Sequence, residues 1–83
     1  MSNRLTDLRQ SLSGYQALVA THTAICQQLR EQRRGATDGA MVKLDERIEM
    51  RERAIAAFNR AIEATEWLIK TEEDELTRYP GIP

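Results

Sequence analysis

The sequence predicts an all-α protein, an antiparallel two-helix hairpin with a coiled-coil seam. Two runs of mostly apolar residues, spaced alternately three and four apart, lie on either side of one glycine-bearing break. This spacing is typical of helices packed side by side through the a and d positions of a heptad. The first run is Leu5, Leu8, Leu12, Tyr15, Val19, His22, Cys26 and Leu29. The second run is Met41, Leu44, Ile48, Arg51, Ile55, Phe58, Ile62, Thr65 and Ile69.

The first helix is expected over about residues 3–34. Ser2 or Asn3 can accept a hydrogen bond from its first free N–H groups. Gly35 is expected to end the helix in the left-handed conformation that glycine adopts easily. Gly14 lies inside the helix, where glycine costs about 1 kcal/mol relative to alanine. Because the heptad continues through this glycine in register, we expect an intact helix with at most a bend.

The rest of the chain divides into a turn, a second helix and a short tail. We expect the turn at residues 35–39, the second helix at about 39–78 and the tail at 79–83, all within one domain, 1–83. Thr37 or Asp38 can cap the second helix. The second helix should stop at Tyr79-Pro80, because a residue before proline avoids the α region.

The two heptad runs match each other when the chain is folded back on itself. Folding about residues 36–37 places apolar residues opposite one another in nearly every layer. The expected pairs are Leu29 with Leu44, Cys26 with Ile48, Val19 with Ile55, Tyr15 with Phe58, Leu12 with Ile62 and Leu5 with Ile69. The exception is His22, which falls opposite Arg51. Two unrelated helices would not match in this way, so the pairing favours the hairpin.

Apolar residues outside the a and d positions predict a second interface. A single seam would leave them uncovered, and small chains bury only a modest fraction of their surface. We therefore expect a homodimer that forms a four-helix bundle. The expected dimer interface comprises Leu18, Ile25, Ala54, Ala57, Ala61, Ala64 and Leu68. The open alternative is that the alanines only favour helix formation.

Residues suited to catalysis or metal binding are scarce. His22 and Cys26 are the only histidine and cysteine, and their spacing of four places both on one helical face in the packing seam. Two copies could in principle bring two such pairs around zinc, but burial of both residues in the core is favoured. The sequence contains no glycine-rich phosphate loop and no credible nucleophile–base pair. We expect no enzyme, no cofactor and no metal site.

The charge pattern argues against a dedicated nucleic-acid surface. The net charge is −1, and residues 30–53 carry seven positive against six negative side chains. Proteins that bind phosphates usually carry a net positive field, whereas mixed charges on helices usually form solvated ion pairs. A contact through the Arg-rich turn, residues 30–34, remains the alternative.

Cysteine content and hydropathy bear on where the protein works. One cysteine cannot form an internal disulfide, which fits a reducing compartment. No apolar run approaches the roughly 20 residues of a membrane span. The first residues also lack the apolar core of a signal peptide. We expect a cytoplasmic protein without a membrane partner.

The end of the second helix carries a candidate partner-binding site. Its residues are Trp67, Glu72, Glu73, Glu75, Leu76 and Tyr79. Aromatic anchors supply much of the energy of an interface, and nearby charges steer association. The alternative is structural, since the acidic side chains would lie near Arg4 and the free N–H groups of the first helix.

These observations predict a non-enzymatic protein–protein interaction module, most simply a small regulator or inhibitor of a larger protein. Charged, heptad-bearing hairpins without catalytic residues are shared by many adaptors, bacterial regulators and phage-encoded inhibitors. Two alternatives stay open. One is a nucleic-acid-associated protein that uses the Arg-rich turn, and the other is a structural subunit of a larger assembly.

Overall fold

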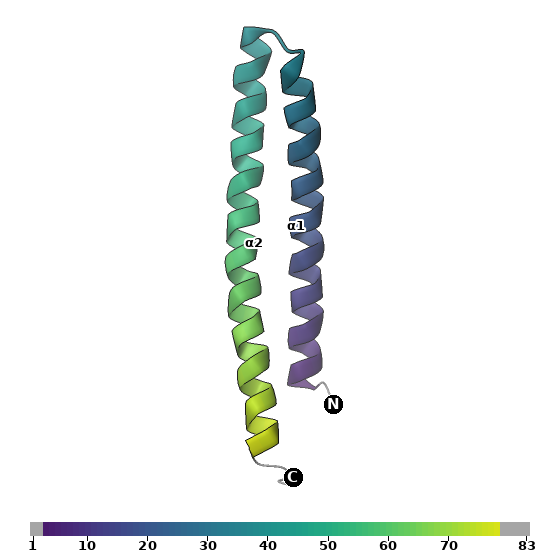
Figure 1. The fold of residues 1–83 in the computed structure, drawn as a ribbon, viewed down its shortest axis with the longest axis vertical. Coiled ribbons are helices and arrows are strands. Elements are labelled where there is room, and N and C mark those ends of the chain that lie inside the picture. The colour runs from purple at the N-terminus through teal and green to yellow at the C-terminus, as the bar shows by residue number, and fades with distance from the viewer. Residues whose placement is uncertain (1–2, 79–83) are drawn as a thin grey trace.

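The computed structural model describes residues 3–78, which form two α-helices packed side by side in opposite directions (Figure 1). α1 is Arg4–Arg34 and α2 is Asp38–Arg78. The hairpin is 65 Å long and only 18 by 15 Å across. α2 continues past the first residue of α1 at the open end (Figure 1). The all-α hairpin expected from the heptads is confirmed, while the expected tail at 79–83 lies outside the described residues.

The predicted cap at the N-terminus of α1 is confirmed, whereas the predicted conformation at its C-terminus is not. Asn3 caps the helix as expected, because its Oδ1 accepts a hydrogen bond of 2.8 Å from the N–H of Leu5. The left-handed conformation expected at Gly35 is wrong, since its φ is −106° and its ψ is 9°. The N–H of Ala36 instead donates to the carbonyl of Arg33 at 3.2 Å. This tight turn leaves the helix at negative φ, so a positive φ is not required.

The turn is shorter than expected because α2 begins one residue earlier. The N–H of Met41 donates to the carbonyl of Thr37 at 2.8 Å, which places Thr37 in the N-cap position. Asp38 then lies in the first turn of α2, where a carboxylate interacts favourably with the positive end of the helix dipole. Three residues, 35–37, therefore connect the helices.

Contacts across the seam confirm the expected antiparallel register. The Sγ of Cys26 lies 4.0 Å from the carbonyl oxygen of Ile48, to which the thiol donates. Farther from the turn, the rings of Tyr15 and Phe58 are 6.1 Å apart. Thr65, a polar seam residue, is buried, and its hydroxyl is satisfied by donating to the carbonyl of Ala61 at 2.7 Å. The apolar core lies in the half of the hairpin nearest the turn.

Most of the seam is only partly shielded from solvent. In the described part of the chain, the buried hydrophobic residues are Cys26, Leu29 and Ile48, at 2%, 8% and 8% exposure. The other a and d residues of both runs, apart from Thr65, are half-buried. A helix with a single neighbour covers its apolar stripe from one direction only. One hairpin therefore leaves its core open along at least one edge.

Replacing Gly14 by alanine should stabilise the hairpin. Gly14 lies inside the unbroken helix α1, and a Cβ built on it meets no atom within 4 Å. Alanine has less conformational freedom to lose, so Gly14→Ala should raise the free energy of unfolding by about 1 kcal/mol. Thermal denaturation followed by circular dichroism should show a melting temperature several degrees higher. An unchanged or lower melting temperature would show that α1 is not a regular helix at this position.

Candidate functional site

One long edge of the hairpin is closed by ion pairs between the helices. The Nη2 of Arg30 donates to Glu52 at 2.6 Å, and the Nη2 of Arg9 donates to Glu73 at 3.2 Å. All four residues occupy e positions of their heptads, so both pairs lie on the same side of the seam. These side chains are about half exposed, and such pairs contribute at most about 1 kcal/mol each. This edge is polar, and the arginines named here are neutralised by glutamates of the same hairpin.

The Arg-rich turn also carries its counter-charges within the fold. The Nε of Arg33 donates to Asp45 at 2.6 Å, and Arg34 lies 3.7 Å from Glu31. The hydrogen bond to Asp45, together with the attraction between the charges, raises the pKa of Arg33 above its ordinary value. With Arg30 also paired, these contacts favour a solvated surface of ion pairs over a phosphate-binding one.

The opposite long edge is apolar over its middle part, between the charged residues Arg47 and Glu75 of α2. The residues expected at a dimer interface occupy the g and c positions, which lie together on the side of the seam away from the ion pairs. Ile25, Ala54, Ala61 and Leu68 are half-buried, while Leu18, Ala57 and Ala64 are exposed. Met50 adds to this edge with 69% of its surface exposed. The structure therefore brings the expected interface residues onto one edge, named here the apolar edge.

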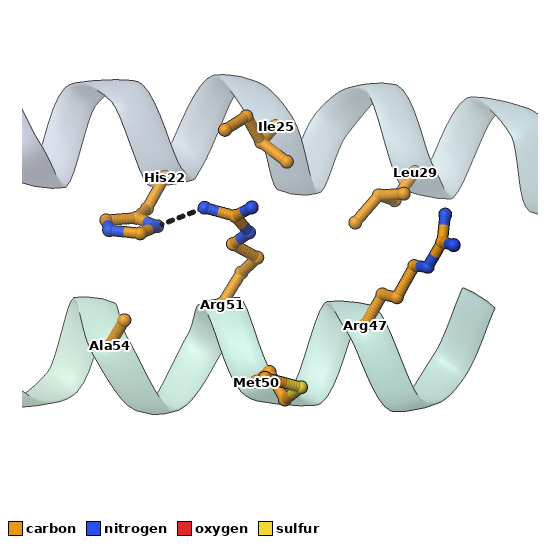
Figure 2. Close-up of a pocket in the computed structure, with 7 residues that line it drawn as sticks. All are labelled: His22, Ile25, Leu29, Arg47, Met50, Arg51 and Ala54. Carbon is orange, nitrogen blue, oxygen red and sulfur yellow. Dashed lines mark hydrogen bonds between the residues drawn. The ribbon is translucent and has the colours of Figure 1, made fainter. Parts of the chain in front are cut away.

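A groove of about 580 Å³ opens on the turn-proximal half of the apolar edge. It is lined by His22, Ile25, Leu29, Arg47, Met50, Arg51 and Ala54. Figure 2 shows Arg47 and Arg51 reaching from α2 toward α1, with Ile25 and Leu29 facing them. The groove thus combines apolar walls with guanidinium groups. Arg47 was not predicted as a site residue from the sequence. Its position could have indicated it, because Arg47 is a cation at a g position of α2, followed at the next g positions by Ala54, Ala61 and Leu68.

The polar layer of the seam lies at one end of this groove. The Nη1 of Arg51 donates to the Nδ1 of His22 at 3.0 Å (Figure 2). Because a guanidinium has donors only, Nδ1 of the imidazole is the acceptor in this contact. The His22 ring also stacks on Phe58, with 5.7 Å between centroids. His22 and Cys26 therefore take part in seam packing. Within residues 3–78, no three His, Cys, Asp or Glu side chains gather into a metal-binding group.

The residues expected to bind a partner do not form one surface. Trp67 and Leu76 are 65% and 59% exposed, but nine residues of helix turn them about 180° apart around α2. Glu72 and Glu73 are held by α1, at 3.6 Å from Arg4 and 3.2 Å from Arg9. Glu75 is exposed, and Tyr79 lies outside the described residues. Trp67 is the only aromatic residue of this set that the structure describes.

Comparisons with known proteins give no family to which the chain can be assigned. No protein-family model, curated protein or solved structure matches it. In the part of the chain that the structure describes, neither helix is long and apolar enough to cross a membrane. Functional inference therefore depends on the two edges of the hairpin and on the exposed Trp67.

Proposed function

We propose that the chain is a non-enzymatic protein–protein interaction module that works as a homodimer, with two hairpins joined along their apolar edges in a four-helix bundle. The observation that carries this proposal is the difference between the two edges. The edge formed by the e positions carries ion pairs that link α1 to α2. The apolar edge, in contrast, exposes Leu18 and Met50 and contains an open groove. Exposed apolar patches of this kind are typical of association sites.

A four-helix bundle would also complete the core. Seam residues such as Leu12, Ile55 and Ile62 are half-buried in one hairpin, and a second hairpin on the apolar edge would shield them further. Burial of apolar surface contributes about 25 cal/mol per Å². Because a two-helix chain of 83 residues has little core of its own, this contribution would be a large part of its stability.

The dimer would act as a small cytoplasmic regulator or inhibitor of a larger protein. Trp67 supports this role, because it occupies an f position, facing away from α1, and is 65% exposed. Exposed tryptophans frequently serve as anchors in protein–protein interfaces. Asp74, which is exposed and lies one heptad beyond Trp67 on the same face of α2, would steer a basic partner toward the anchor. A structural subunit of a larger assembly would use the same surface and remains the second form of this proposal.

Trp67→Ala should weaken binding to such a partner by about 2 kcal/mol, roughly 30-fold in affinity. The measurement is affinity capture: tagged protein is incubated with extract from the native cell, and the bound proteins are identified by mass spectrometry. The matched control is Val42→Ala, which removes another apolar side chain that is 59% exposed but lies near the turn. A specific partner should be retained by the wild type and the control and lost from Trp67→Ala. A partner retained equally by all three would exclude Trp67 as the anchor.

A further inference from the structure

The groove on the apolar edge is open in a single hairpin, and a segment of α2 from a second copy of the chain has the residues to fill it. We infer that the groove of each hairpin holds residues 68–75 of α2 from a second copy, with the two α2 helices antiparallel and a two-fold axis at Ala61. This inference rests on the homodimer proposed above and specifies its contacts. Leu68 of the second copy would cover Ala54 in the groove wall, and Glu75 of the second copy would pair with Arg47.

The order of residues along α2 fits this arrangement. The g positions from 47 to 75 read Arg47, Ala54, Ala61, Leu68 and Glu75. These positions are evenly spaced on both sides of Ala61. Ala54 and Leu68 are small or apolar neighbours of Ala61, and Arg47 and Glu75 at the two ends carry opposite charges. Two helices related by a two-fold axis at Ala61 would therefore bring each end against its complement. The alanine at the axis would let the helix axes approach closely, since their separation depends on the side chains at the contact.

The c positions of α2 agree with the same axis. Under this axis Ala57 faces Ala64 of the second copy, and Met50 faces Thr71. Met50 is 69% exposed in one hairpin and lines the groove, so the second copy would cover it. In the proposed dimer, the numbers of facing residues sum to one more at the g positions than at the c positions. The hairpin seam has the same difference of one residue between its a and d layers, because Cys26 meets Ile48 and Tyr15 meets Phe58. The two helices α2 would pack with the geometry already used within the chain.

Charge selects this direction and this register over the others. Parallel α2 helices would place Arg47 against Arg47 and Glu75 against Glu75, which is repulsive. A shift of one heptad either way would set the Glu75 carboxylate against Ala40 or Ala54, without a cation. Among residues 3–78, neither Arg47 nor Glu75 has an ion-pair partner within the hairpin. The two charges are therefore free to pair between copies.

Disulfide trapping of the full chain tests the axis directly. Ala61→Cys should cross-link to itself rapidly under mild oxidation, because the two Cα atoms meet at the axis within the range that a disulfide spans. Ala54→Cys and Leu68→Cys should not cross-link alone, since each thiol lies about 21 Å along the bundle from its own copy. Mixing these two variants should restore cross-linking. The control is the wild type, whose one thiol, Cys26, is 2% exposed.

Each outcome separates this inference from the homodimer itself. Cross-linking of all three single variants would show parallel helices, and cross-linking of none in a protein that still sediments as a dimer would show that α2 meets another surface. Either result would overturn the register while leaving the homodimer standing. A monomer would overturn both.

A charge swap measures the proposed pair independently. Arg47→Glu and Glu75→Arg alone should each raise the dimer dissociation constant roughly tenfold, because each places like charges together twice per dimer. The double variant should return it to within about threefold of the wild type. Single effects that simply add in the double variant would show that these residues do not meet.

Discussion

Ile48→Asp should unfold the hairpin. Ile48 is 8% exposed and lies against Cys26 near the turn, in the best-shielded layer of the seam. Aspartate there would lose the packing of the isoleucine and place a carboxylate among apolar side chains without a cation. The combined cost is about 3 to 5 kcal/mol, which is comparable with the whole stability of a small domain. Far-ultraviolet circular dichroism at 25 °C should show loss of most of the helical signal.

The matched control for this prediction is Val42→Asp. Val42 precedes Ile48 in α2 and is also β-branched, but it is 59% exposed. Its new carboxylate would lie near the N-terminus of α2, where negative charge is tolerated or favourable. The control should therefore keep its helical signal and its melting temperature within a few degrees. Equal helix content in the two variants would show that Ile48 does not face α1.

Ala61→Arg should dissociate the homodimer and leave the hairpin folded. Ala61 is half-buried at the centre of the apolar edge, and two arginines would meet there in a symmetric dimer. The loss of close packing and the repulsion of the charges should raise the dissociation constant about 100-fold or more, near 2.7 kcal/mol. Arginine is a good helix former, so helix content at high protein concentration should change little. Sedimentation velocity over a dilution series provides the measurement.

Ala56→Arg is the matched control, because it makes the same change on the other side of α2. Ala56 is exposed and occupies a b position, next to the ion-paired edge. This variant should associate like the wild type. If both variants dissociate, the effect comes from added charge in general, and if neither does, the apolar edge is not the dimer interface.

The fold could be predicted from the sequence because the heptad positions determine both the helices and their register. Cys26, Ile48, Tyr15 and Phe58 meet as expected. The short break between the two runs fixes where the chain folds back, and that fold sets apolar residues opposite one another in nearly every layer. The conformation of Gly35 was mispredicted because glycine permits a left-handed residue without requiring one. A turn at negative φ over residues 35–37 connects the two helices, where residues 35–39 were expected.

The candidate site could be predicted only in part. Heptad position assigned Ile25, Ala54 and Ala61 to one edge, because helix geometry fixes the direction of a side chain from its number. The groove beside them depends on how far Arg47 and Met50 reach across the seam, and rotamers cannot be derived from spacing. The partner-binding set was chosen by residue type and nearness in sequence, which ignores the half turn of helix between Trp67 and Leu76.

Sedimentation equilibrium of the wild type, at tens of micromolar protein, tests the central proposal most directly. If the apolar edge is the interface between two copies, the mass should be twice the 9.5 kDa of one chain. The same samples should keep their helical signal by circular dichroism. A single species of 9.5 kDa across the concentration range, with the helix intact, would contradict the homodimer and show that the hairpin is stable with its apolar edge exposed.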